Sequence, residues 1–299
     1  MIRLLTLAAL LIPGVPAAQH AAQLPAYLLQ VPDSIAAIFV AETGTSTLHR
    51  FEIGGSGPEY RDEHYMSVGQ NGVGKRRAGD RRTPLGIYFV NEQLDTSKLH
   101  ERYGPLAFPL DYPNVWDRSN ERRGDGIWIH GVAPGGGRRP PLDTDGCIAL
   151  PNDDLLALEY QLKPLVTPVI ITRQIHWLSP DNIAATRTEL AAVLDLWAAS
   201  NRSGDLHQYL SLYADEFEYR GMDRGEWAAY RLRTVSEAMI QEFELQDVLL
   251  LADPEDSGLY LSRFRQKIVD GGRMIVTTKR LYWRRNAEGD LKIIAEDNG

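Results

Sequence analysis

The sequence predicts a two-domain protein in which a β-rich domain of sandwich or barrel type precedes an α+β domain. The chain has 299 residues, which is more than one ordinary domain needs. Short apolar runs separated by Gly-rich turns dominate the chain up to Thr172, with little helical periodicity. Helical periodicity begins after a polar stretch that contains Ser179-Pro180-Asp181.

Residues 1–22 are expected to be a signal peptide. Arg3 precedes an apolar run over residues 4–15, and small alanines after that run offer cleavage points. The run is shorter than the roughly 20 apolar residues of a membrane-spanning helix, and Pro13 interrupts it. An uncleaved anchor is the alternative. No later segment could span a membrane, so we expect an exported protein whose mature chain has no transmembrane segment.

Strands joined by Gly-rich loops are the predicted elements of the first domain. Residues 34–51 resemble a hairpin. Further strands are expected at 87–90, 126–130, 147–150 and 167–171. Asn152 is expected to cap a helix that follows the fourth of these strands, because Asp153 and Asp154 in its first turn favour the positive end of the helix dipole.

The second domain is predicted to combine helices with antiparallel strands. Leu190, Val193, Leu194 and Trp197 form one apolar helix face, and Leu206, Tyr209, Leu210 and Tyr213 form another. In the last sixty residues, half-buried strands are expected at 259–264, 273–278, 280–283 and 291–294. We therefore place the first domain at 34–173, a linker at 174–182 and the second domain at 183–299.

Composition excludes several classes of function. The formal net charge is −8, and acidic and basic residues are interspersed, so no basic stripe is present that would neutralise a phosphate backbone. Nucleic acid is therefore not an expected partner. The histidines show no metal-ligand spacing, so we expect neither a metal nor another cofactor.

Cys147 is the only cysteine, which excludes an intrachain disulfide. In an exported protein such a residue is a reactive thiol, half of an intermolecular bridge, or an inert buried side chain. A nucleophilic cysteine needs a nearby histidine or a cationic field, because a thiol is mostly protonated at neutral pH. His130 stands 17 positions earlier, at the end of a predicted strand and across a long Gly-rich loop. Spacing alone leaves the catalytic and the structural interpretation open.

Glycines flank both residues. Gly131 follows the histidine and Gly146 precedes the cysteine, and both let a substrate backbone approach closely. The amides of Gly146 and Cys147 are candidates to face a developing oxyanion, a type of contact that typically contributes about 3 to 4 kcal/mol per donor.

These residues resemble the catalytic domain of L,D-transpeptidases of the YkuD type. The motifs are His130-Gly131, a loop, Thr144-x-Gly146-Cys147-Ile148, Asp80-Arg81-Arg82-Thr83-Pro84-Leu85-Gly86 and Tyr103-Gly104-Pro105. The resemblance covers residues 34–173 and implies a β-rich fold without a cofactor. It also implies that a cysteine attacks the carbonyl of the third residue of a peptidoglycan stem, usually a diamino acid, and that D-alanine leaves.

The resemblance assigns roles to three residues. Cys147 is then the nucleophile, His130 the general base and afterwards the acid, and the Gly131 carbonyl the group that orients the imidazole. Transfer of the acyl group to an amine would make the protein an L,D-transpeptidase, and transfer to water an L,D-carboxypeptidase. Either activity implies a periplasmic or cell-wall-associated protein whose partner is the peptide stem.

Two positions depart from the family pattern. Asp145 stands where family members often have histidine, and Ala149 where they often have arginine. The missing arginine removes an expected carboxylate contact, for which Arg138 or Arg139 is a candidate substitute. These departures also support an alternative, a non-catalytic module that binds the cell wall.

Three more residues belong to the predicted substrate-binding set. Thr144 and Gly146 precede the cysteine directly. Trp128 points to the same face of its strand as His130, by the period of two, and is expected to wall the pocket. A core tryptophan is the alternative for this residue.

The second domain resembles a SnoaL-like cone-shaped α+β domain. The resemblance rests on Trp197, Asp205-Leu206-His207-Gln208-Tyr209, Phe217 and Thr278-Lys279-Arg280-Leu281-Tyr282-Trp283. A cone has a concave mouth, which suits a ligand or a protein partner, and self-association through residues 183–299 is a further possibility.

Overall fold

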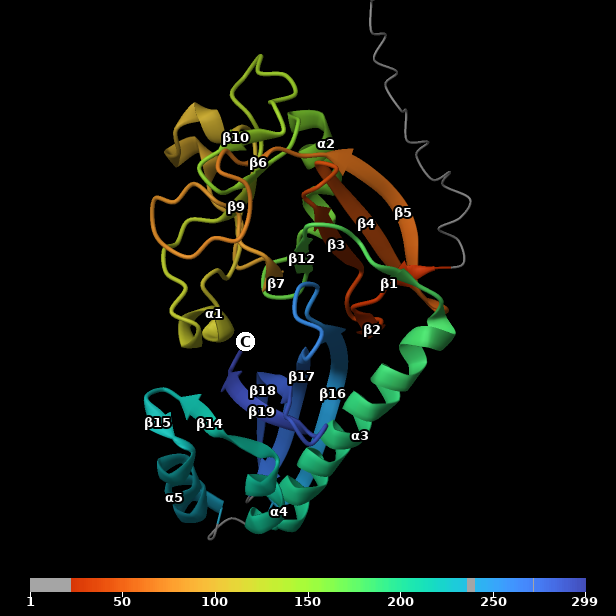
Figure 1. Ribbon diagram of the computed structural model, residues 1–299, viewed down its shortest axis with the longest axis vertical. Coiled ribbons are helices and arrows are strands. Elements are labelled where there is room, and N and C mark those ends of the chain that lie inside the picture. The colour runs from red at the N-terminus through yellow and green to blue at the C-terminus, as the bar shows by residue number, and fades with distance from the viewer. Residues whose placement is uncertain (1–22, 236–239, 271) are drawn as a thin grey trace, which may run out of the picture.

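A computed structural model describes residues 23–235, 240–270 and 272–299 and shows two lobes stacked along the long axis of the molecule (Figure 1). The expected signal peptide lies outside the described residues. Among the helices of the described part, none combines the length and apolar character that crossing a membrane requires.

A five-stranded sheet forms one layer of the first lobe. Its order is β5-β4-β3-β12-β7. The bounds are Ala37–Glu42 for β3, Thr47–Gly54 for β4, Gly57–Tyr65 for β5, Gly86–Phe89 for β7 and Pro168–Thr172 for β12. β3 and β4 form the expected hairpin, and β12 runs parallel to β3 with Val169 opposite Phe39.

A smaller sheet carries the candidate site. It has the order β11-β9-β8, with β8 at Ala107–Pro109, β9 at Trp128–His130 and β11 at Ile148–Ala149. A two-stranded pair, β6 (Val68–Gly69) and β10 (Leu142–Thr144), lies close by. The helices of this lobe are short: α1 (Val115–Ser119), α2 (Asn152–Leu158), η2 (Thr96–Lys98), η3 (Glu101–Tyr103) and η4 (Glu159–Gln161).

The second lobe is α+β, as expected. Its helices are α3 (Pro180–Ser203), α4 (Leu206–Ser211) and α5 (Arg224–Val235). Its strands are β14 (Tyr213–Tyr219), β15 (Met222–Asp223), β16 (Ile240–Ala252), β17 (Leu259–Asp270), β18 (Arg273–Arg285) and β19 (Leu291–Asp297). Ser179 caps α3 by accepting from Asn182 N, and Gly204 ends the helix with a left-handed φ of 70°.

Residues 24–30, ahead of the expected start of the first domain, pair with later segments. β1 (Leu24–Pro25) pairs with β13 (Trp177–Leu178). β2 (Leu28–Gln30) pairs with β16 and so becomes the last strand of a seven-stranded sheet, β15-β14-β19-β18-β17-β16-β2. The sheet of the second lobe therefore includes a strand from the start of the described chain.

Three local predictions are wrong. The two strands expected at 273–278 and 280–283 are one continuous strand, β18. Tyr213, placed on a helix face, opens β14 because α4 ends at Ser211. Asn152 does not cap α2: Pro151 holds that position without a side-chain hydrogen bond, and the amide of Asn152 binds Val132 instead.

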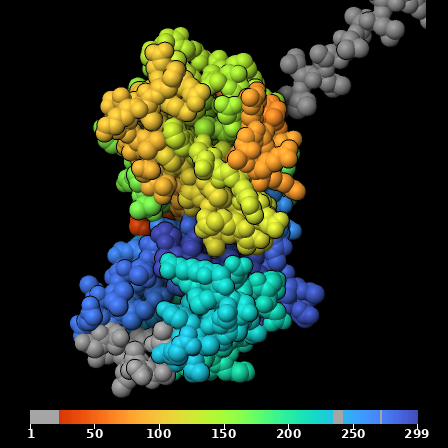
Figure 2. Space-filling view, turned by 90° about the vertical axis from the view of Figure 1, so that its left-hand side faces the viewer, coloured from red at the N-terminus to blue at the C-terminus, as the bar shows by residue number. Residues whose placement is uncertain are grey.

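The last strands are not half-buried where they meet the first lobe. Along β17, Tyr260 and Phe264 pack into the core of the second lobe, whereas Leu259 and Leu261 pack against the first lobe. The five-stranded sheet shows the same division: odd-numbered residues of β3 such as Phe39 face its own core, while Ile38 and Val40 face the second lobe. Where they meet, both sheets are therefore buried on both faces, and the space-filling view shows the lobes in contact across the middle (Figure 2).

A buried ion cluster crosses the same junction. Arg280 of β18 is 8% exposed. It contacts Asp111 of the first lobe, and its Nε donates to Asp297 Oδ1 of β19 at 2.6 Å. Since each charge has a partner of opposite sign, the junction combines apolar burial with a specific polar contact.

Candidate active site

Cys147 and His130 open into one pocket of about 340 Å³. Its lining residues are Gln70, Arg102, Tyr103, Gly126, His130, Arg139, Asp143, Thr144, Asp145 and Cys147. The pair comes together because β11 and β9 are parallel neighbours, with Ile148 opposite Ile129 and Ala149 opposite His130. Cys147 directly precedes β11, and its side chain lies at the start of β9, where Sγ contacts the Gly126 carbonyl.

The thiol of Cys147 is nearly buried and protonated at rest. The residue is 9% exposed, and Sγ donates to the Gly126 carbonyl at 3.3 Å. Burial raises the pKa of the Cys147 thiol, and a backbone hydrogen bond from Trp128 opposes that rise without cancelling it. The resting site therefore holds a thiol.

His130 is neutral at physiological pH. It is 3% exposed, and burial lowers its pKa to about 4, although the hydrogen bond to the Gly131 carbonyl acts in the opposite direction. The Nδ1 atom lies 2.6 Å from the Gly131 oxygen. A carbonyl only accepts, so Nδ1 carries the proton in this contact and Nε2 presents a lone pair. The pocket is thus lined by a thiol and a neutral imidazole.

Asn152 holds the backbone that follows His130. Its Oδ1 accepts from Val132 N at 2.8 Å, and its Nδ2 donates to the Val132 carbonyl at 3.0 Å. A Cβ on Gly131 would lie 2.3 Å from the same Oδ1, so glycine is required there. The carbonyl that contacts the imidazole is therefore fixed from the far side by one amide side chain.

Thr83 and Thr144 hold the turn before the cysteine. Thr83 Oγ1 donates to the Gly146 carbonyl and accepts from Gly69 N, both at 2.9 Å. Gly146 has a φ of 126°, and a Cβ there would lie 2.7 Å from the Arg82 carbonyl. The Gly146 amide donates to Thr144 Oγ1 at 3.1 Å, so it would have to leave that oxygen before it could face an oxyanion.

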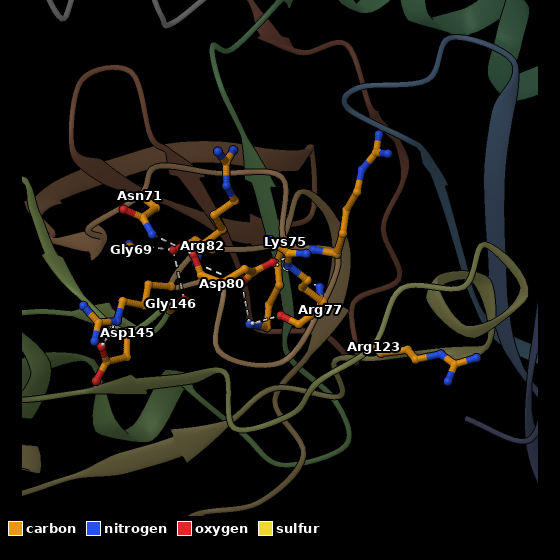
Figure 3. A network of polar contacts seen from close by, with 12 residues as sticks. Gly69, Asn71, Lys75, Arg77, Asp80, Arg82, Arg123, Asp145 and Gly146 are labelled. Carbon is orange, nitrogen blue, oxygen red and sulfur yellow. Dashed lines mark hydrogen bonds and ion pairs between the residues drawn. The ribbon is translucent and has the colours of Figure 1, made fainter.

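Asp80 organises the loop that contains Thr83 (Figure 3). Its carboxylate accepts from Lys75 Nζ at 2.9 Å and from the amides of Arg76, Arg77 and Arg82 at 2.8, 3.1 and 3.2 Å. Burial alone would raise the pKa of Asp80, but these hydrogen bonds lower it to about 2. The carboxylate stays ionised, and it fixes the segment that leads to Thr83.

The other predicted binding residues are divided between the pocket and its surroundings. Thr144 and Arg139 line the pocket, and Arg139 Nε pairs with Asp143 Oδ2 at 2.8 Å. Gly146, Trp128 and Arg138 are not among the lining residues. Trp128 packs against Tyr103 at 4.8 Å between ring centroids, and the Arg138 guanidinium lies 3.5 Å from the ring centre of Tyr65.

Sequence reasoning missed Arg102, Tyr103 and Gln70. The ring of Tyr103 packs edge-on against His130 at 5.1 Å, and all three residues line the pocket. The Tyr103-Gly104-Pro105 motif was a signal for this turn. No local pattern indicates that the turn folds back over the histidine.

Comparison with known proteins identifies both lobes. Residues 39–171 match the model of the L,D-transpeptidase catalytic domain, YkuD. Residues 189–297 match the Cds6 C-terminal NTF2-like domain. No curated protein sequence matches the chain.

Two solved structures have the same arrangement of both lobes. Bd1075 from Bdellovibrio bacteriovorus is 24% identical, with a TM-score of 0.76, over 92% of this chain and 97% of its own. The helical cell shape determining protein Pgp2 from Campylobacter jejuni is 25% identical, with a TM-score of 0.72, over 88% of this chain and 91% of its own.

The fold and its pocket thus define a two-domain enzyme, in which a β-rich catalytic domain is joined to an NTF2-like α+β domain of the SnoaL-like cone fold. The chain carries an L,D-transpeptidase catalytic domain of the YkuD type.

Proposed function

We propose that this protein is exported and that Cys147 attacks the carbonyl between the third and fourth residues of a peptidoglycan tetrapeptide stem, with release of D-alanine. The observation that carries the proposal is the shared pocket, into which Cys147 and His130 both open from neighbouring strands. The likeness to a cell shape determining protein extends over both lobes and therefore includes the NTF2-like domain.

The first half of the reaction begins with proton transfer. As Sγ bonds to the scissile carbonyl carbon, Nε2 of His130 takes the thiol proton and the carbonyl oxygen becomes an oxyanion. The tetrahedral intermediate collapses, the carbon–nitrogen bond breaks, and His130 returns the proton to the departing amine of D-alanine. Cys147 is left as a thioester.

The second half decides between two activities. An amine of another stem gives an L,D-transpeptidase, and water gives an L,D-carboxypeptidase. In either case the attacking group gives its proton to His130, the carbon–sulfur bond of the second tetrahedral intermediate breaks, and His130 returns the proton to the sulfur. The hydrolytic activity is the second candidate, because the two-lobe likeness is to a protein named for determining cell shape, which trimming of stems would alter.

Purified tetrapeptide muropeptides test the proposal. Free tripeptide alone means hydrolysis, and crosslinked dimers mean transfer, as read by mass spectrometry. We expect Cys147→Ser to abolish both products and to prevent accumulation of a thioester. Absence of both products with the wild-type protein would leave a non-catalytic module that binds the cell wall.

Iodoacetamide provides an independent test of the pair. We expect alkylation of Cys147, and a rate that rises with pH without a plateau below about pH 9, because burial raises the thiol pKa. A fast rate that is constant between pH 5 and 8 would mean a resting thiolate, contrary to the proposed general-base mechanism.

A further inference from the structure

Arg102 is the charged residue of the pocket that has no carboxylate partner. Four charged side chains line the pocket besides His130 and Cys147: Arg102, Arg139, Asp143 and Asp145. Arg139 pairs with Asp143 at 2.8 Å, and Asp145 pairs with Arg81 at 3.6 Å. Among the residues that the structure describes, none forms an ion pair with Arg102, although the charge of Asp145 acts on it from a distance.

The guanidinium of Arg102 is nevertheless held in place. One of its Nη atoms donates to the Tyr103 hydroxyl at 2.7 Å, and its Cζ lies 4.8 Å from the Tyr103 ring centre. The same ring packs edge-on against His130. A guanidinium has five N–H donors, so most of them remain for a ligand in the pocket. Arg102 is therefore an exposed cation of the pocket wall that Tyr103 orients, and the Tyr103 ring lies between it and the proposed base.

Its charge reaches both reacting side chains. The positive charge of Arg102 contributes to lowering the pKa of His130 and the pKa of Cys147, although burial is the larger influence on each. Coulombic interactions weaken with distance, so the two side chains that would contact the scissile bond lie within the electric field of the Arg102 guanidinium.

We propose that Arg102 binds the C-terminal carboxylate of the donor stem, next to the scissile bond, and so takes the role of the arginine that many family members have at the position of Ala149. The inference rests on the proposed function. The carboxylate carbon of the departing D-alanine lies on the order of 3 to 4 Å from the scissile carbon, within the reach of one pocket. A planar guanidinium suits such a group because it can donate two parallel hydrogen bonds.

Substrates without one carboxylate test the proposal. The kcat/KM for cleavage of the bond before the fourth residue is measured, as release of D-alanine or of D-alaninamide, with a tetrapeptide stem and with its C-terminal amide. A stem whose diamino acid carries an amide in place of its side-chain carboxylate is the control substrate. We expect the wild-type protein to prefer the free acid over the C-terminal amide by about tenfold to a hundredfold, and to cleave the control stem as well as the free acid. The Arg102→Gln variant should lose that preference, because its kcat/KM should fall for the free acid and stay unchanged for the C-terminal amide.

Matched variants separate binding from folding. Arg61→Gln removes an exposed arginine of β5 and should keep the full preference. Arg102→Lys should recover part of the preference, since it keeps the charge but not the paired donors. Alkylation of Cys147 by iodoacetamide and an unchanged unfolding transition confirm that Arg102→Gln has folded.

The failures are distinguishable. If the wild-type protein cleaves the free acid and the C-terminal amide equally, or if Arg102→Gln retains the preference, Arg102 does not bind the C-terminal carboxylate and the proposed function stands. If the wild-type protein processes no stem, the proposed function is wrong and the role of Arg102 falls with it.

Discussion

The two lobes position their residues by different means. The catalytic lobe places its chemistry on the short strands β9 and β11 and on loops, and it fixes those loops with buried polar contacts from Asp80, Thr83 and Asn152. The NTF2-like lobe consists of long strands whose side chains alternate between two apolar cores. Loops admit a substrate but need side chains to hold them, whereas a long sheet supplies a stiff surface.

The largest expected effect comes from separating the lobes. Deleting residues 174–299 would expose the outer face of the five-stranded sheet, including Ile38, Val40 and Ile170. Each such side chain contributes about 1.5 to 3 kcal/mol when buried, and a whole domain has only about 5 to 15 kcal/mol. We therefore expect residues 23–173 alone to be insoluble or unfolded by circular dichroism.

A nicked chain is the control for that deletion. Proteolysis at a site inserted between residues 173 and 180 should leave both pieces associated and folded, because the shared apolar layer stays covered. A soluble fragment of residues 23–173 with a cooperative melting transition would show that the lobes are independent.

Arg280→Ala tests the polar part of the junction. The change leaves Asp111 and Asp297 without their partner, so we expect a loss of about 3 to 5 kcal/mol in the free energy of unfolding, measured with urea. Arg265→Ala is the matched control: its pair with Asp247 is half exposed, and a loss of about 0 to 1 kcal/mol is expected. Equal losses for the two variants would contradict the role of the buried cluster.

The pH dependence tests the electrostatics of the catalytic lobe. Burial lowers the pKa of His130 to about 4, so the base is neutral above that pH and protonated below it. We expect kcat/KM to be flat from about pH 5 to neutrality and to fall about tenfold per unit below pH 4. The measurement is the initial rate of D-alanine release, with recovery of activity on return to pH 7 as the control. A fall in kcat/KM that is centred near pH 6.5 would mean that His130 is exposed to solvent during the reaction.

Asn152→Ala tests the polar fixation of the loops. The change leaves the N–H and carbonyl of Val132 without their side-chain partner, which costs about 1 to 3 kcal/mol. We expect kcat to fall more than KM rises, because the Gly131 carbonyl that orients His130 loses its support. Asn152→Asp keeps the acceptor for Val132 N and should retain part of the activity. A change in KM alone would assign Asn152 to substrate binding instead.

The fold class was predictable because local patterns suffice for it. Short apolar runs between glycines predicted the β-rich lobe, and the motifs around His130 and Cys147 predicted the family. Burial on both faces was not predictable, since a period of two tells which residues share a face but not what covers it. The false break in β18 fell at Lys279, whose charge interrupts the apolar pattern; its partner Glu296 stands on the neighbouring strand β19.

The candidate site was predictable where residues close in sequence form it. Gly131 next to His130 is such a case. Arg102 and Asn152 could not be found in this way, because their positions in the site depend on a turn and a helix that fold back over β9. A single residue outside any motif does not indicate which distant segments it will contact.

The pairing of β2 with β16 has a consequence for the order of folding. Leu28 lies opposite Leu251, so a strand near the start of the described chain finds its neighbour only after most of the chain has been made. Until then the apolar outer surface of the catalytic sheet has no cover, and a partly synthesised chain would expose it to aggregation. We expect late protection of the Leu28 amide in refolding followed by hydrogen exchange, and early protection would contradict this order.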